Sequence, residues 1–408
     1  MVREDNTRMS TGREARQGHG IQLTPGNDCT HAAPRTAEHT PIRKRTSTLH
    51  DFPYRGERRK CFHPWIINLT PPGRAHCAHD CVFCYAREAI YSDPGESARV
   101  YENLPDLMER DLARLRLAPP VLLSTTTDPC QPSAAVREQT RRVVEVLVRW
   151  GLSFALTTKG DPGFLAELPS FREHDRKAVL VSIEGPPEVL ELLSPGAPAY
   201  WDRLAALRRM GAFGAWVGVR LDPYLLHVYQ GLYGADWWER TERLLDDFAC
   251  AAARHVVAST GRLDCRRLPG AEASLLERVV HAVREGVSPE AAAQMEADYR
   301  RGWSGTCRGY VLREDLRREL HLRLRTACEA RGMTFASCQE LPESCDSPGL
   351  PTCEGFLLPF CRKGPDGRFH PVEGCTANCH VACAGVSTPP CGCPELAQPL
   401  PYRPALLK

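Results

Sequence analysis

Three cysteines lie close together in the first quarter of the chain, in the segment Cys77-Ala-His-Asp-Cys81-Val-Phe-Cys84. Thiolates at this C-x3-C-x2-C spacing can bind three irons of a [4Fe–4S] cluster and leave the fourth iron open. A tetrahedral zinc site would need a fourth ligand, which His76 or His79 could provide. The spacing favours the cluster, and it predicts the three cysteines as metal ligands.

A second group of nine cysteines crowds the chain after residue 337. It consists of Cys338, Cys345, Cys353, Cys361, Cys375, Cys379, Cys383, Cys391 and Cys393. The evenly spaced ones, which we expect to bind an auxiliary [4Fe–4S] cluster, are Cys338, Cys345, Cys353 and Cys361. The later, denser ones would form a second site or a supporting zinc site. Because no paired C-x2-C of a zinc ribbon occurs among the nine, only composition supports zinc.

Composition fits metal-binding thiolates. The chain has 408 residues and 19 cysteines. An odd, high cysteine count without an apolar leader argues against a disulfide scaffold and predicts a reducing, cytoplasmic location. No run of about 18 apolar residues occurs, so no membrane span is expected. Against 50 acidic residues stand 52 basic ones, so overall charge gives no reason to expect nucleic-acid binding.

Alternating apolar and amphipathic segments must position these cysteines. Buried strands are predicted over 65–70, 121–127, 154–160, 178–185, 215–223 and 255–263. Between them, helices are predicted over 104–117, 135–150, 200–211 and 236–253. Six strand–helix repeats predict an α/β fold, a partial (β/α)6 barrel of TIM type, with chemistry at the carboxyl ends of its strands. A doubly wound sheet is the alternative, although no G-x-G-x-x-G follows the first strand.

Three domains are expected. Residues 1–60 are polar and would form a flexible or draped arm. The barrel would span 61–335, with helices throughout 270–335, including the amphipathic segment 310–332. Residues 336–408 would form an irregular Cys-rich extension. Because this extension has few large apolar residues, metal coordination would have to stabilise it.

The first cysteine triplet resembles the signature of the radical S-adenosylmethionine (SAM) superfamily, C-x3-C-x-aromatic-C, with Phe83 in the aromatic position. The loop after the first barrel strand is also where that superfamily carries its signature. The resemblance implies a [4Fe–4S] cluster whose open iron binds SAM, with Phe83 and Tyr85 near the cofactor. It also implies a 5′-deoxyadenosyl radical that abstracts a substrate hydrogen, and an external electron donor of flavodoxin or ferredoxin type.

Residues at the ends of the next strands resemble the spore photoproduct lyase branch of that superfamily, over roughly residues 62–265. They are Thr126-Thr127-Asp128, Thr158-Lys159 and Ser182. The resemblance implies that Thr127, Asp128, Lys159 and Ser182 contact SAM. The Lys159 ammonium would neutralise the SAM carboxylate, although a solvated lysine is the plainer reading.

Two positions near these strand ends have less certain roles. Where the lyase has a hydrogen-donating cysteine, this chain has Thr125, whose O–H bond is too strong for that role. Cys130, five residues further on, is the candidate catalytic cysteine, with a plain buried or ligand cysteine as the alternative. Arg220 ends the fifth strand, where it could bind a phosphate or carboxylate or form a structural ion pair.

Three functions are compatible with these residues. The first is a radical SAM enzyme of natural product biosynthesis that modifies a small molecule, a nucleotide among the candidates, with the auxiliary cluster taking part by sulfur insertion or electron transfer. This layout resembles the sulfur-inserting enzymes of thionucleoside antibiotic pathways. The second is a DNA repair enzyme like spore photoproduct lyase, which Thr125 disfavours. The third is a non-catalytic metal-binding protein, which the open-site triplet disfavours.

Overall fold

The computed structural model describes residues 38–48, 60–87, 92–93, 95–264, 273–304, 307–398 and 404–408. Most of the arm predicted for 1–60 lies outside these residues. Residues 34–408 form one compact unit, so the Cys-rich extension packs with the barrel rather than as a separate body. No helix of the described chain is both long enough and apolar enough to span a membrane.

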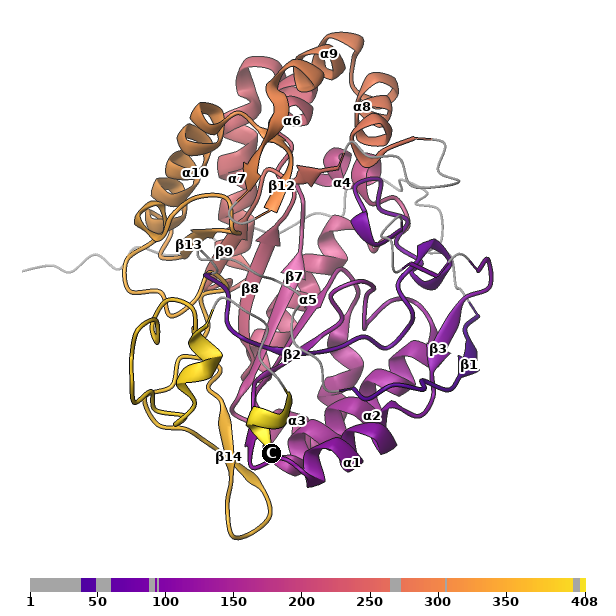
Figure 1. Cartoon of the computed structure of the whole chain (residues 1–408). Helices are drawn as coiled ribbons and strands as arrows, with labels where there is room; N and C mark the ends of the chain where they lie inside the picture. The colour runs from indigo at the N-terminus through magenta and orange to yellow at the C-terminus, as the bar shows by residue number, and fades with distance from the viewer. Residues whose placement is uncertain are drawn as a thin grey trace, which may run out of the picture. The chain divides into compact units, whose positions relative to one another are not determined.

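A seven-stranded parallel sheet forms the centre of the molecule (Figure 1). Its strands are β2 Trp65–Ile67, β5 Val121–Leu123, β6 Phe154–Thr158, β7 Lys177–Ser182, β8 Trp216–Leu221, β9 His255–Ala258 and β13 Thr334–Ser337. They are ordered β13-β9-β8-β7-β6-β5-β2, and every neighbouring pair is parallel. All six predicted strands are confirmed, and β13 adds a seventh. Since β2 and β13 are the two edges of this sheet, the barrel is partial.

Helices alternate with the strands as predicted, and further helices follow. They are α1 Leu104–Ala113, α2 Ala134–Trp150, α3 Pro169–Glu173, α4 Pro187–Leu193, α5 Tyr200–Ala212, α6 Leu226–Tyr233, α7 Trp237–Cys250, α8 Leu275–Gly286, α9 Pro289–Asp298 and α10 Glu314–Glu329. Helix α2 illustrates why they begin and end where they do. The Ser133 side chain accepts a hydrogen bond from the Val136 amide, and Gly151 ends the helix at φ 74°. Glycine is required there, because a side chain would also collide with the Phe369 carbonyl.

The expectation of helix throughout 270–335 is wrong in its middle. Strands β11 Tyr299–Ser304 and β12 Cys307–Leu312 form an antiparallel hairpin, and β12 also pairs with β10 Arg262–Leu263. Helix α10 therefore begins at Glu314 and not at 310. The physical reason is that Gly309, Tyr310 and Val311 are poor helix formers, and pairing with β10 and β11 favours the extended chain.

The Cys-rich extension adds to the core of the barrel, contrary to the expectation that it depends on metal alone. Phe356, Phe360 and Phe369 are all buried. The Phe356 ring lies 5.1 Å from that of Phe62 and 5.4 Å from that of Trp216. Strands β14 Cys361–Lys363 and β15 Phe369–Pro371 form a hairpin that pairs with β4 Leu117–Ala118. The extension thus shares a hydrophobic core with the sheet.

Removing the Phe356 ring tests this shared core. We expect Phe356→Ala to lower the free energy of unfolding by about 3–5 kcal/mol, because the ring is fully enclosed. The matched control is Leu357→Ala, since Leu357 is 57% exposed while Phe356 is 2% exposed. Urea unfolding of both variants measures the difference. Equal losses would mean that the extension does not pack into the barrel.

Candidate active site

The cysteine triplet lies in the loop that follows β2, between 3₁₀ turns at Arg74–His76 and Tyr85–Arg87. The three thiols are close enough that the charge on Cys81 responds to both Cys77 and Cys84. Burial raises the pKa of Cys77 to about 12 and also raises those of Cys81 and Cys84. Cys81 is buried, whereas Cys77 and Cys84 are partly exposed. Three neighbouring thiols in one loop fit a metal cluster, because metal binding displaces their protons and compensates the thiolate charges.

Side chains from distant parts of the chain hold this loop in place. Gln131 accepts a hydrogen bond from the Ala78 amide at 2.9 Å and donates one to the His76 carbonyl at 3.0 Å. Arg278 of α8 donates to the carbonyls of Val82 at 2.8 Å and Cys84 at 3.4 Å. The sequence analysis missed both residues, because nothing local marks a side chain that binds a backbone so far away.

The two histidines considered as zinc ligands have other partners. His76 Nε2 lies 2.9 Å from Asp93 Oδ2, and its Nδ1 accepts a hydrogen bond from the Arg99 amide at 3.0 Å. Burial lowers the pKa of His76 to about 4, so the ring is neutral. His79 Nε2 lies 3.0 Å from Asp128 Oδ2. Both nitrogens of His76 are thus engaged, whereas His79 Nδ1 has no hydrogen-bond partner among the described residues.

Asp128 connects the cysteine loop to the ends of two strands, β5 and β6. Its Oδ1 accepts hydrogen bonds from the Cys130 amide at 2.7 Å and from the Thr158 hydroxyl at 2.6 Å. Its Oδ2 accepts one from the Lys159 amide at 2.6 Å and also faces His79. Burial raises the pKa of this carboxyl, but His79 and the accepted hydrogen bonds outweigh that effect and hold it well below its usual value. Asp128 therefore positions the residues around it.

Lys159 lies beside the cysteine loop and is held by a buried carboxylate. Its Nζ is 2.7 Å from Glu184 Oε1 and 5.3 Å from the centre of the Phe83 ring. Glu184 also binds Arg203 at 2.8 Å, and both side chains of that second pair are fully buried. Burial lowers the pKa of Lys159, but the Glu184 charge outweighs it and raises the pKa above its usual value. Sequence analysis missed both Glu184 and Arg203.

The other residues expected near SAM lie at or after the carboxyl ends of the sheet's strands. Ser182 is the last residue of β7 and is buried. The Thr127 hydroxyl lies 2.7 Å from the Thr70 hydroxyl. Tyr85 is half exposed and donates its hydroxyl to the Thr125 carbonyl at 2.6 Å. The two hydrogen bonds join the segment after β5 to the segment after β2 and to the end of the cysteine loop.

Arg220 pairs in register with Ser182 across β7 and β8. Its Nη2 lies 2.5 Å from Asp222 Oδ2 and 3.6 Å from Cys338 Sγ. The structural ion pair considered for Arg220 is thus present, and the same side chain also reaches a cysteine of the extension.

Cys130 is fully buried. Any side chain at position 160 would collide with the Cys130 carbonyl, so Gly160 lets the two backbones pack closely. Burial raises the pKa of Cys130 well above the usual value for a thiol. This environment is typical of a core cysteine.

The four cysteines expected to bind one auxiliary cluster lie in different surroundings. The Cys353 thiol interacts with Cys338 and with Cys61, a residue that the sequence analysis did not single out. Arg318 Nη1 lies 3.6 Å from Cys345 Sγ. Cys361, in β14, lies 3.4 Å from the hydroxyl of Ser153, which precedes β6. The structure therefore brings Cys338 and Cys61 to Cys353, while Cys345 and Cys361 contact Arg318 and Ser153.

A separate group forms near the end of the extension. Cys375 interacts electrostatically with Cys383 and Cys391, and Cys393 also interacts with Cys391. Cys375, Cys379 and Cys391 are buried. These are the later, denser cysteines that the sequence analysis treated as a second site.

Neither a protein-family model nor a curated protein sequence matches the chain. Among the solved structures that are similar to it are two of spore photoproduct lyase. A double mutant of spore photoproduct lyase with bound AdoMet and dinucleoside spore photoproduct is 17% identical, over 72% of this chain and 80% of that chain, with a TM-score of 0.50. Spore photoproduct lyase complexed with the same dinucleoside is 16% identical, over 73% and 81%, with a TM-score of 0.49. The chain therefore has a radical SAM fold of the spore photoproduct lyase type.

Replacing Asp128 tests its positioning role. We expect Asp128→Ala to lower the free energy of unfolding by about 3 kcal/mol, because three buried donors would lose their acceptor. The control is Asp175→Ala, whose side chain is 76% exposed and whose loss should cost less than about 0.5 kcal/mol. Urea unfolding measures both. Comparable values would mean that the Asp128 hydrogen bonds do not stabilise the strand ends.

Proposed function

We propose that this protein is a radical SAM enzyme in which Cys77, Cys81 and Cys84 bind a [4Fe–4S] cluster and Lys159 binds SAM. The observation that carries the proposal is the position of three neighbouring thiols, beside a lysine, at the carboxyl ends of the strands of a partial barrel. In this position the fold gathers residues from several strands around one loop.

The chain's own residues would bind and orient the cofactor. When bound, the cluster and SAM supply an organic radical that abstracts a hydrogen atom from the substrate. Lys159 would face the SAM carboxylate, and Glu184 keeps its ammonium charged and directed toward the cysteine loop. Phe83 lies under the same ammonium and limits its contact with water. Thr127 and Ser182 would donate hydroxyl hydrogen bonds from the neighbouring strand ends.

A small-molecule substrate fits this site better than DNA. Thr125 cannot donate a hydrogen atom, and Cys130 is buried, so the hydrogen-donor role predicted for Cys130 lacks support. The net charge of +2 gives little attraction to a polyanion. We therefore favour modification of a small molecule, a nucleotide among the candidates, over repair of the spore photoproduct lyase kind. The electron would come from a flavodoxin- or ferredoxin-type donor.

We further propose that the late cysteines bind an auxiliary [4Fe–4S] cluster that takes part in the reaction, with sulfur insertion as the candidate chemistry. Cys375, Cys383 and Cys391 support this, because their thiols lie close enough to interact electrostatically. Cys393 is the natural fourth ligand, since it interacts with Cys391. This set replaces the evenly spaced cysteines, two of which face other side chains.

The cysteine triplet is tested by SAM cleavage. We expect the anaerobically reconstituted, dithionite-reduced protein to convert SAM to 5′-deoxyadenosine, measured by chromatography. A variant with all three of Cys77, Cys81 and Cys84 replaced by Ala should lose this activity, because it lacks the cluster ligands. The exposed Cys250 provides the control, since Cys250→Ala should retain it. No cleavage by the parent, or cleavage by the triple variant, would refute the proposal.

The role of Lys159 is tested by SAM affinity. Lys159→Met removes the charge but keeps most of the aliphatic chain, and we expect SAM affinity to fall about 10- to 100-fold. This corresponds to roughly 1.5–3 kcal/mol for a charged hydrogen bond. Lys363→Met is the control, because Lys363 donates to the carbonyls of Leu112 and Ala113 away from the cysteine loop. Calorimetric titration that finds unchanged affinity in Lys159→Met would exclude this contact.

A further inference from the structure

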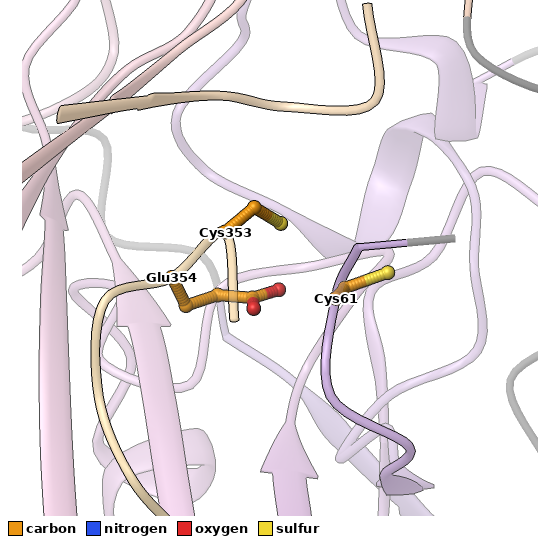
Figure 2. Close-up of side chains that lie close together, drawn as sticks. All are labelled: Cys61, Cys353 and Glu354. Atoms are coloured by element: carbon orange, nitrogen blue, oxygen red, sulfur yellow. The ribbon is translucent and has the colours of Figure 1, made fainter. Parts of the chain in front are cut away.

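A second set of metal-ligating atoms lies apart from the cysteine triplet. The Cys61 and Cys353 sulfurs and a carboxylate oxygen of Glu354 all lie within 4.8 Å of one another, and all three residues are buried. Figure 2 shows Cys353 and Glu354 on one segment, with Cys61 beside them on another. Cys61 precedes β2, whereas the other two belong to the extension. Three chemically suitable side chains from distant segments thus meet in the interior.

The Glu354 carboxylate is buried, and one of its oxygens lacks a hydrogen-bond donor. Glu354 is 8% exposed, and its Oε2 has no hydrogen-bond partner among the described residues. The nearby cation, Arg220, directs its Nη2 to Asp222 and Cys338. A buried carboxylate oxygen without a donor is costly unless the carboxyl is protonated or an ion compensates it. A metal ion between the two thiols and this carboxylate would supply that compensation.

Cys338 is the candidate fourth ligand, although its thiol lies outside the group whose atoms are all within 4.8 Å of one another. Its thiol interacts with that of Cys353, and it follows directly after β13. N–H donors face two of the sulfurs: Arg220 Nη2 lies 3.6 Å from Cys338 Sγ, and Gln339 Nε2 lies 3.6 Å from Cys61 Sγ. Donors around the sulfurs are the outer-shell arrangement that stabilises metal-bound thiolates.

The spacing of the ligands favours one ion over a cubane. A tetrahedral zinc ion with bonds of about 2.3 Å to sulfur and about 2.1 Å to oxygen holds its ligand atoms roughly 4 Å apart. In a cubane each thiolate binds a different iron, so the sulfurs lie farther apart. Among the described residues, Cys61, Cys353 and Glu354 meet the 4.8 Å limit. The Cys338 side chain would have to move closer to them when it binds the ion.

We propose that Cys61, Cys338, Cys353 and Glu354 bind a single tetrahedral zinc ion. Four protein ligands make this a closed, structural site. The ion would join the segment before β2, the end of β13 and the extension, and so connect the two edges of the sheet. The Arg220 guanidinium compensates part of the excess negative charge of three thiolates and a carboxylate. The site is independent of the proposed SAM chemistry.

The experiment measures the metals bound by the full chain after anaerobic purification from medium containing both zinc and iron. Mass spectrometry should find about one zinc per chain in the parent. Cys61→Ser and Cys353→Ser should lose it, and Glu354→Gln should bind zinc at least 10-fold more weakly in chelator competition. Cys250→Ser, at an exposed cysteine, should keep it. The variant lacking the cysteine triplet should also keep its zinc, which separates this proposal from the proposed SAM chemistry.

X-ray absorption at the zinc edge of the parent gives a result that does not depend on whether the variants fold. A shell of three sulfurs and one oxygen is expected. A parent without zinc, a zinc shell without sulfur, or unchanged zinc in Cys61→Ser and Cys353→Ser would overturn the proposal. So would the loss of about four irons per chain in those two variants, which would identify a cubane instead.

Discussion

A fully buried carboxylate, Glu184, organises the strand ends on which the candidate site depends. It compensates two cations at once, Lys159 at 2.7 Å and Arg203 at 2.8 Å. Arg203 also donates to the Ser182 carbonyl, so the same network holds the end of β7. Removing one partner of such a network leaves an uncompensated buried charge, which costs about 3–5 kcal/mol. The ion pair with the buried Glu184 therefore positions the Lys159 ammonium beside the cysteine loop. This position does not depend on contact with a cofactor.

Contacts between the ends of neighbouring parallel strands continue from this network across the sheet. Because Ser182 and Arg220 are register partners on β7 and β8, their side chains lie on the same face of the sheet. Arg220 in turn reaches Cys338, which follows β13. One row of strand ends thus connects the cysteine loop after β2 to the thiols near the opposite edge.

The parts that sequence could predict are those encoded locally. Six strands are recognisable because each is a short, continuous apolar run, as in 178–185, and the cysteine triplet is recognisable because its ligands lie within eight residues. The hairpin of β11 and β12 was missed, since its strands are stabilised by each other and by β10. Glu184 gave no local sign of its role, because both of its cations come from other elements. Cys61 was passed over because its partners lie almost at the other end of the chain.

The extension enters the barrel because a partial barrel leaves one side uncovered. His255, at the start of β9, lies 3.0 Å from the Cys353 carbonyl, and the next turn of chain needs glycine. Gly355 has φ 77°, and a side chain there would collide with the His255 ring. This close approach brings Phe356 against Trp216 and turns Cys353 and Glu354 toward Cys61. Aromatic packing thus fixes the backbone of this turn, and the turn positions the Glu354 carboxylate and the Cys353 thiol in the interior. The proposed zinc ion would compensate this polar cluster, since burial has already removed the water that would otherwise solvate Glu354.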